Sequence, residues 1–179
     1  MMAKQFLRLL STACFLCGTG FTAQAQQVSD DKLTVSGHGK TAFMSNERAY
    51  YGDFHFSPAV RAGDFVFVSG VVAGAFRQEA PINKETFKNS IRGAFTSLKD
   101  VLELAGADIN QTVKMRTFHV FDSPLIDVSK VEQVKAVAEV KSEFIGEPHP
   151  AWTAVGTTAL LPDAGLVEIE VVVYAPLEK

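Results

Sequence analysis

The chain has no cysteine after residue 17, so nearly all of it can form no disulfide, no thiolate nucleophile and no cysteine-ligated metal site. The two cysteines that it does have, Cys14 and Cys17, lie in an apolar N-terminal segment. Their Cys-x-x-Cys spacing is typical of a redox pair, but the segment around them has the layout of a secretory signal peptide. We therefore expect both cysteines to be removed with that segment.

The N-terminal segment has a basic start, an apolar middle and an end rich in small residues. Lys4 and Arg8 precede the apolar stretch, and Ala23 and Ala25 follow it. This pattern predicts cleavage after Ala25, and the apolar part is shorter than a membrane span requires. Residues 1–25 are thus predicted to be a signal peptide. The protein is expected to be periplasmic or extracellular, with no membrane attachment after cleavage.

Positive charge is scarce in the remaining chain. The whole sequence has 17 Lys and Arg against 20 Asp and Glu, and residues 1–25 hold two of the basic residues and none of the acids. The net charge after cleavage is therefore −5, and no basic cluster stands out. Because nucleic-acid binding draws its affinity from concentrated Lys and Arg, we expect no nucleic-acid partner.

Sequence motifs for metal binding and for serine hydrolysis are absent as well. No two of the four histidines, His38, His55, His119 and His149, have the spacing of a metal site. There is no Gly-x-Ser-x-Gly nucleophile motif, and no glycine run has the spacing of a phosphate-binding loop. The sequence predicts neither a metal nor an organic cofactor.

The roughly 154 residues that remain after cleavage are enough for one domain with its own core. Residues 26–40 are polar and contain glycine, so we expect them to form a flexible N-terminal arm. The domain itself is expected to span residues 41–179. Its first part, up to a turn at Ser57-Pro58, interleaves aromatic and polar residues and predicts a strand or hairpin.

Apolar residues at three- and four-residue spacing predict two amphipathic helices. The first covers residues 83–106, with Asn83 as its N-cap and Gly106 as its stop. The second covers residues 129–144. Its inner stripe is expected to consist of apolar side chains, namely Val131, Val134, Val137 with Ala138, and Phe144.

Alternating and apolar runs predict the strands. A buried strand is expected over residues 65–68, ending at Ser69-Gly70, and further strands over residues 112–121, 151–160 and 166–175. In the second of these strands Val113, Met115, Thr117 and His119 are expected to share one side, with His119 half-buried. With two crossover helices between strands, we expect a mixed sheet with both helices on one face.

The last strand carries the clearest alternation in the chain. Ile169, Val171 and Val173 are expected to point toward the helices, and Glu168 and Glu170 to point the other way, together with Val172 and Tyr174. A sheet face that carries two acids together with apolar side chains is expected to lie against another subunit or a cleft. This alternation predicts an oligomer.

Five phrases occur in a fixed order along the chain: FSPAVRAGDFVFVSG, LELAGAD, VKMRTFHVFD, PAWTAVG and LVEIEVVVYA. Together they resemble the reactive intermediate deaminase family, also called RidA or YjgF, from about residue 56 to residue 175. The resemblance implies an α+β fold like that of chorismate mutase, assembled as a homotrimer with ligand clefts between subunits. For the best-known branch it also implies hydrolysis of reactive enamines and imines of amino acids, with release of ammonia and without a cofactor.

The resemblance also implies site residues, and the sequence departs from some of them. The deaminating branch has an arginine that binds the substrate carboxylate where this chain has Trp152. An indole offers one N–H and no charge in place of a bidentate guanidinium. A frequent tyrosine is Phe56 here and a frequent cysteine is Ala154, whereas the acid thought to orient or activate water is kept as Glu168. Ser69 and Gly70, whose counterparts line the family's cleft, are kept too.

These departures predict a branch of the family that lacks the arginine and binds a different ligand. Trp152 is expected either to form an aromatic wall for a flat or cationic ligand or simply to pack at a subunit contact. Arg116 and Arg61 are the candidates to replace the lost guanidinium. Arg61 is expected instead to be a solvent-exposed turn residue, and Arg116 to reach the cleft from another direction.

Three functions remain open from the sequence. The first is small-molecule binding in clefts between subunits with turnover, as a cofactor-free hydrolase or deaminase of enamines and imines in which Glu168 handles water. The second is a non-catalytic small-ligand-binding or protective protein of the exported compartment. The ribonuclease activity that the resemblance also brings is ranked third, because the chain has no basic groove and no catalytic histidine pair.

Overall fold

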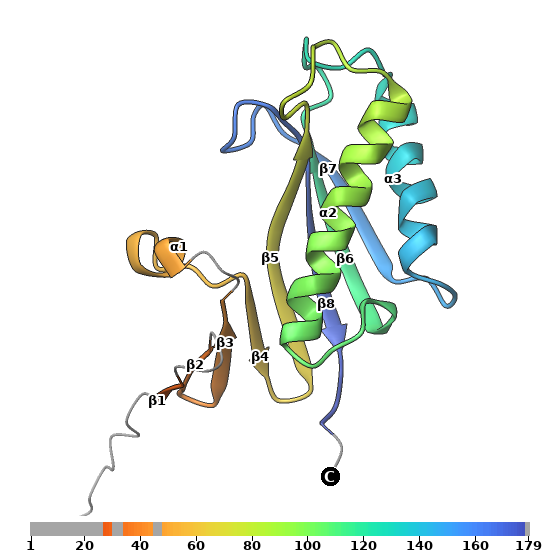
Figure 1. Ribbon diagram of the computed structural model, residues 1–179. Coiled ribbons are helices and arrows are strands. Elements are labelled where there is room, and N and C mark those ends of the chain that lie inside the picture. Colours follow the sequence, from red (N-terminus) through yellow and green to blue (C-terminus); the bar gives the residue numbers. More distant parts are fainter. Residues whose placement is uncertain (1–26, 30–33, 45–47, 178–179) are drawn as a thin grey trace, which may run out of the picture.

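A computed structural model describes residues 27–29, 34–44 and 48–177, and the predicted signal peptide lies outside the described residues. Within these ranges, one eight-stranded mixed sheet carries two long helices on one face (Figure 1). No helix among the described residues combines the length and the apolar character needed to cross a membrane. The elements are β1 (Gln27–Ser29), β2 (Thr34–Gly37), β3 (Lys40–Phe43), α1 (Arg48–Asp53), β4 (Ala59–Ala62), β5 (Phe65–Gly74), α2 (Lys84–Leu104), a 3-10 turn (Ile109–Gln111), β6 (Thr112–His119), α3 (Lys130–Phe144), β7 (Ala151–Gly156) and β8 (Gly165–Tyr174).

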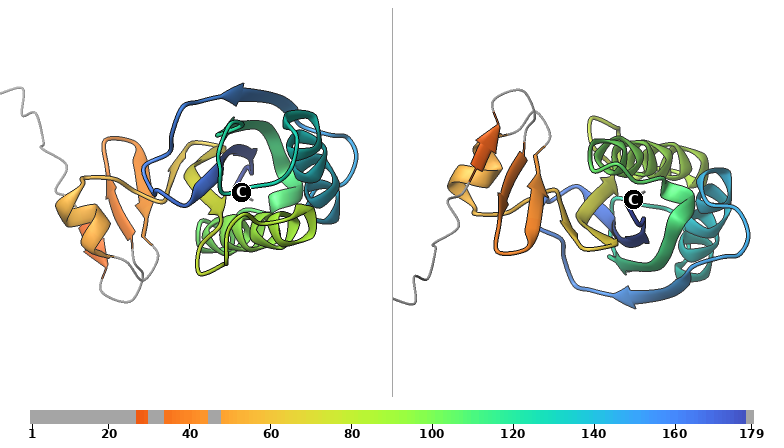
Figure 2. Two further views of the ribbon diagram at one scale, coloured as in Figure 1. Left: turned by 90° about the horizontal axis from the view of Figure 1, so that it is seen from above. Right: turned by 90° about the horizontal axis from the view of Figure 1, so that it is seen from below.

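The strands follow the order β1-β2-β3-β4-β5-β8-β6-β7. All neighbours are antiparallel except β6 and β7, which are parallel. The last strand, β8, is inserted between β5 and β6, so β7 and β8 are not paired although they follow each other in the chain. Views along the strands show α2 and α3 side by side, with β1–β3 and α1 set apart from them (Figure 2).

Most of the predicted arm is part of this sheet. Residues 34–43 form the β2–β3 hairpin, which pairs with β4 and extends the sheet beyond it. The hairpin turns at His38 and Gly39, both with positive φ, as a two-residue turn between antiparallel strands requires. Val35 and Ala42 are buried in a small cluster with Met44. The expected flexible arm thus differs from the structure over residues 34–40, because alternating residues flank a short His-Gly turn there.

The predicted helix α2 and the alternation of β8 are confirmed. The N-cap Asn83 accepts a hydrogen bond from the backbone N–H of Thr86 at 3.0 Å, and Gly106 follows the helix with φ +68°. The helix buries one stripe against the sheet: Phe87, Ile91, Ala94, Phe95, Leu98 and Leu102. On β8, Ile169, Val171 and Val173 are buried on the helix side, which leaves the two acids on the open face.

The structure corrects the prediction for α3. Val131, expected on the inner stripe, is 61% exposed, whereas Gln133, Ala136, Val137, Val140 and Lys141 are buried. Val137 is buried as predicted, and Phe144 packs against the core. The stripe differs from the prediction in leaving out Val131 and in including two polar residues, Gln133 and Lys141, which apolar periodicity does not select. Gln133 is accommodated because its amide donates to Val128 O at 2.9 Å and to Phe121 O at 3.4 Å, so it ties the helix to the preceding loop.

Strand β5 is longer than predicted. It continues through Ser69 and Gly70 to Gly74 because β8 pairs with it along this whole length. Between Val68 and Val71, three residues of β5 advance against two of β8, which is the signature of a β-bulge. The Ser-Gly pair that predicts a strand end is thus the bulge itself.

The prediction of a solvent-exposed Arg61 is wrong. Its side chain is 8% exposed and donates to the carbonyl oxygens of Ala105 at 2.8 Å, Gly106 at 3.1 Å and Ala175 at 2.5 Å. The first two are free carbonyls at the C-terminal end of α2, where a cation is favourable. Arg61 therefore joins β4 to the end of α2 and to the end of β8, and it is not available to bind a ligand.

Replacing Arg61 with Ala is expected to lower the free energy of unfolding by about 2–4 kcal/mol, because three carbonyl oxygens lose a charged donor. Equilibrium unfolding in urea measures this loss. The matched control is Lys99→Ala, which removes an exposed cation of α2 that only pairs with Glu103 at 3.6 Å; it is expected to cost less than about 0.5 kcal/mol. Equal losses in both variants would contradict the role of Arg61.

Strand β6 has one buried polar side and one open side. Thr117 and His119 are fully buried with Met115 on the helix side, so the expectation of a half-buried His119 is wrong. Val113, expected on the same side, is 44% exposed because the register shifts between Thr112 and Lys114. His119 Nε2 lies 2.9 Å from Thr117 Oγ1, and the imidazole stacks on Phe121 with ring centroids 4.9 Å apart.

Burial lowers the pKa of His119 from 6.5 to about 4. Between these values the unfolded chain binds a proton at this position and the folded chain does not, so stability falls as the pH falls from 6.5 toward 4. We expect a loss of about 2–3 kcal/mol between pH 7 and pH 4.5 from this residue. Urea unfolding at both pH values measures this loss. In His119→Gln the stability lost between pH 7 and pH 4.5 should be smaller by this contribution. An identical pH dependence in that variant would contradict the role of His119.

Candidate functional site

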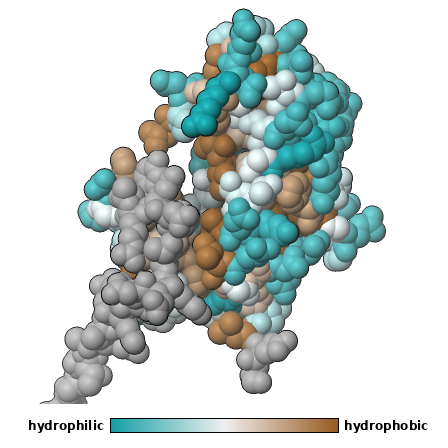
Figure 3. Space-filling view, viewed as in Figure 1, coloured by the Kyte–Doolittle hydropathy of each residue, from teal (hydrophilic) through white to brown (hydrophobic). Residues whose placement is uncertain are grey.

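The main candidate site is a pocket of about 670 Å³ around Glu168, hereafter the Glu168 pocket. It lies where β5 continues beyond β4, which pairs with β5 only as far as Val68. Hydrophobic atoms run along this part of β5 beside the hydrophilic outer surface of α2 (Figure 3). Its lining is mostly apolar and comes from the loop before β4, from β5, from α2, from the loop before β8 and from β8 itself: Phe54, Phe56, Pro58, Val68, Ser69, Gly70, Val71, Val72, Ser97, Asp100, Val101, Leu161, Pro162 and Glu168.

Gly70 is required in this pocket because the Glu168 carboxyl occupies the space of its missing side chain. A Cβ built on Gly70 would lie 1.8 Å from Glu168 Oε1. The bulge brings the two residues together from neighbouring strands. Burial, and second the negative charge of Glu170, raise the pKa of Glu168 above its ordinary value. The carboxyl is therefore suited to take up and release a proton closer to neutral pH than an exposed glutamate.

Ser69 positions the loop that carries Phe56. Its hydroxyl donates to the carbonyl oxygen of Ser57 at 2.8 Å, and its backbone N–H donates to Pro58 O at 2.9 Å. Both bonds hold the start of β4 against the bulge. Ser69 thus lines the pocket, with its hydroxyl proton engaged by the protein.

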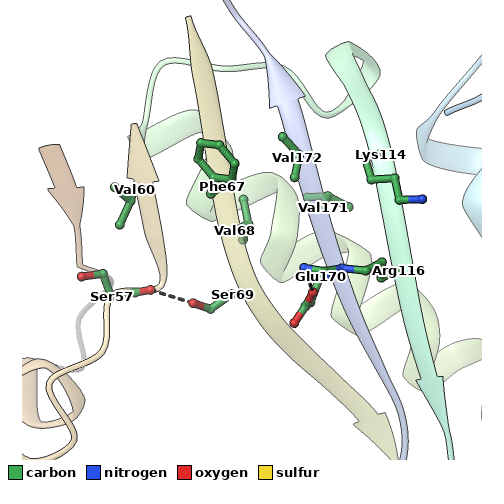
Figure 4. Close-up of a pocket in the computed structure, with 10 residues that line it drawn as sticks. All are labelled: Ser57, Val60, Phe67, Val68, Ser69, Lys114, Arg116, Glu170, Val171 and Val172. Atoms are coloured by element: carbon green, nitrogen blue, oxygen red, sulfur yellow. Dashed lines mark hydrogen bonds and ion pairs between the residues drawn. The ribbon is translucent and has the colours of Figure 1, made fainter. Parts of the chain in front are cut away.

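A second pocket of about 240 Å³, the Arg116 pocket, lies on the open face of the sheet and shares Val68 and Ser69 with the first. Figure 4 shows Arg116 reaching across β8 toward Glu170. Arg116 Nη2 lies 2.7 Å from Glu170 Oε2, and the two residues are direct neighbours on β6 and β8. Lys114 also lines this pocket and donates to Thr153 Oγ1 at 2.9 Å. Two cations thus lie beside the Glu168 pocket.

Trp152 lies on the opposite face of the sheet from these pockets. It is the register neighbour of buried Met115 and packs against the main core. Its indole Nε1 donates to Thr117 Oγ1 at 3.0 Å, and the ammonium of Lys141 lies 6.0 Å from its ring centroid. Within one chain Trp152 therefore forms no wall beside Glu168. Its contacts with the core are enough to explain a tryptophan at this position. A wall that it contributes to another chain stays a prediction.

The sequence predicted Glu168, Ser69 and Gly70 as one site, and the structure brings them together. It places Arg116 in the adjoining pocket and separates Arg61 and Trp152 from both. The sequence alone does not predict that Arg116 pairs with Glu170, or that Asp100 lies in the Glu168 pocket. The alternation of β6 and β8 carries the signal for the pair, because it puts both residues on the open face, but the register between the strands is needed to match them.

No group of three or more His, Cys, Asp or Glu side chains is arranged to hold a metal ion within the described ranges.

The fold and the site together define an α+β protein with an apolar pocket around one partly buried acid. The sequence profile of a family described as endoribonuclease L-PSP matches residues 47–175. The chain therefore belongs to this family, which includes the RidA and YjgF proteins. The resemblance of the five sequence phrases to the RidA and YjgF family is thus confirmed as membership of the family.

Similar proteins are spread over distant organisms. YjgH, a RutC family protein of Escherichia coli strain K12, is 32% identical over 75% of this chain and 93% of its own length. A 2-iminobutanoate/2-iminopropanoate deaminase of Dermatophagoides farinae is 30% identical over 66% of this chain and 84% of its own. A Mycobacterium tuberculosis structure from the YjgF/YER057c/UK114 family has a TM-score of 0.58 at 25% identity, over 76% of this chain and 99% of that one.

Replacing Gly70 with Ala is expected to displace the Glu168 carboxyl, because the added methyl group and Oε1 cannot occupy the same place. The carboxyl resonance of Glu168, followed by NMR, should shift and titrate at a different pH, while the fold is kept because a flexible side chain can move. The matched control is Gly93→Ala on the exposed side of α2, where nothing lies within 4 Å. It should leave Glu168 unchanged and stabilise the helix by about 0.5–1 kcal/mol. An unshifted Glu168 in the Gly70 variant would contradict the packing described.

Proposed function

We propose that the protein is an exported member of the RidA family that binds small reactive nitrogen compounds and hydrolyses enamines or imines to release ammonia. The observation that carries the proposal is Glu168, a carboxyl of raised pKa set against Gly70 in an apolar pocket. The name of the Dermatophagoides farinae relative, 2-iminobutanoate/2-iminopropanoate deaminase, supports the same chemistry. Export rests on the signal-peptide pattern of residues 1–25.

Hydrolysis of an imine adds water across the C=N bond and then breaks the C–N bond. One proton must leave the attacking water, and the nitrogen must gain protons before it departs as ammonia. A single carboxyl can serve both steps in turn, as the base that takes the proton of water and then as the acid that returns it to nitrogen. Glu168 fits this role because the apolar lining of its pocket raises the affinity of its carboxyl for a proton.

Arg116 is the group that we assign to the ligand carboxylate in place of the missing family arginine. It is 55% exposed and lines a pocket that adjoins the Glu168 pocket through Val68 and Ser69. A guanidinium there gives a charged partner to a carboxylate whose reactive end lies near Glu168. Nη2 of Arg116 forms the ion pair with Glu170, so a ligand carboxylate would share the guanidinium with that acid.

The proposed assembly is the homotrimer that the family resemblance implies. The open face of the sheet exposes aromatic side chains, with Phe65 41%, Phe67 48% and Tyr174 44% accessible. Phe65 contacts both of the other rings, at centroid distances of 6.5 and 5.3 Å. A cluster of this kind is typical of a subunit contact. In such an assembly the pockets would lie close to a neighbouring chain.

A second candidate is a non-catalytic binding or protective protein with the same pocket. Two observations favour it over turnover. The position of the family arginine holds Trp152, which faces the core, and the cation that could replace the arginine is paired with Glu170. In that case the apolar lining around Glu168 would hold the ligand without water attack.

The first experiment is ammonia release by residues 26–179 from imines generated in situ from several amino acids. Release above background is expected, and Glu168→Gln should lower it by about 100-fold or more, as loss of an acid-base group does. Glu143→Gln, which removes an exposed acid paired with Arg92 at 2.8 Å on the far side of the helices, is the matched control and should keep full activity. No release from any imine would contradict the hydrolase and favour the binding protein.

A further inference from the structure

Glu168 and Glu170 project from the same face of β8, but only Glu170 has a cation beside it. Glu168 and Glu170 are two residues apart on an alternating strand, so their Cα atoms are about 6.6 Å apart. Glu170 forms its ion pair with Arg116, directly opposite on β6. Glu168 instead lies opposite Phe118 on β6 and Val72 on β5. Within the described residues its carboxyl has no ion-pair partner.

The charged groups around Glu168 come from three elements. On β8 it faces Glu170, on β6 the nearby cation is Arg116, and from α2 the carboxyl of Asp100 lines the same pocket. Lys114 is further along β6 and bonds to Thr153 on β7. The neighbouring part of β5 adds only Gly70 and the uncharged residues around it. The balance of charge at Glu168 therefore depends on whether Arg116 compensates Glu170.

We propose that Arg116 and Glu170 form a positioning pair that couples the binding of a ligand carboxylate to the uptake of a proton by Glu168. A carboxylate that binds Arg116 competes with Glu170 for the guanidinium. The ligand then brings its own negative charge, and Glu170 loses part of its compensation. Both changes favour the protonated form of Glu168. The ligand class, an oxo or imino acid, rests on the proposed function.

Through this coupling, Glu168 becomes protonated when the ligand binds. In the free protein Arg116 neutralises Glu170, and Glu168 holds its proton less firmly than it does beside a bound anion. When a carboxylate arrives, Glu168 takes up a proton and gives it to the imine nitrogen. The resulting carboxylate is then the base that takes the proton of the attacking water and returns it to the leaving nitrogen. Because binding and protonation are linked, a lower pH must also tighten carboxylate binding by the same factor.

The test is a carbon-13 NMR titration of the Glu168 carboxyl in the full mature chain with labelled glutamate, assigned with Glu168→Gln. Glu170→Gln removes the like charge and is expected to lower the titration midpoint by roughly 0.5–1 pH unit. Arg116→Gln leaves Glu170 uncompensated and is expected to raise it by a similar amount. Saturating pyruvate, used as the carboxylate probe, should raise the midpoint in the unmodified protein but not in Arg116→Gln.

Lys114→Gln is the matched control, because it removes a cation from the same face that bonds to a hydroxyl group rather than to an acid. Its midpoint should shift by less than half of the change seen for Arg116→Gln. Shifts of the same sign in Arg116→Gln and Glu170→Gln, equal shifts in the Arg116 and Lys114 variants, or no response to pyruvate would each overturn the coupling. The titration needs no turnover. The expected shifts in a protein that releases no ammonia would support the coupling and overturn the hydrolase.

Discussion

The insertion of β8 between β5 and β6 decides what each face of the sheet does. Because β8 is paired on both sides, its alternation fixes one row of side chains in the core and the other on the open face. Ile169, Val171 and Val173 fill the helix side. A slip of one residue would bury Glu168 and Glu170 under the helices and expose the apolar row, which the burial of charge makes prohibitive. The register of this strand therefore fixes the chemistry of the pockets.

The site occurs where the regular pairing of the sheet is interrupted. β4 ends its pairing at Val68, and at that point β5 bulges at Ser69 and Gly70. At the bulge, the Glu168 carboxyl fills the space that any side chain at position 70 would occupy. The hydrogen bonds of Ser69 hold the adjacent loop in position. Bulges commonly occur beside functional sites because they change the direction of a side chain without ending the strand. Here the bulge aligns an acid with an apolar pocket.

Local patterns in the sequence were enough to predict the helices and strands whose side chains follow a regular period. The stripe of α2, its cap at Asn83 and the alternation of β8 each depend on residues close in sequence, and the family resemblance supplied their arrangement. Arg61 could not be placed in this way, because its partners lie 44 and 114 residues away. Trp152 could not be placed either. It is on an edge strand with polar and apolar residues on both sides, so only its parallel register with β6 decides which way it points.

Trp152 also determines what the intrinsic fluorescence of the protein reports. It is the only tryptophan in the chain. Its indole donates a hydrogen bond to Thr117 in the layer between the sheet and the helices. Emission from this ring therefore follows the attachment of the edge strand β7 to the core, with buried Lys141 as its charged neighbour. A change in emission would show that β7 has loosened from the core even where the pockets on the other face keep their ligand.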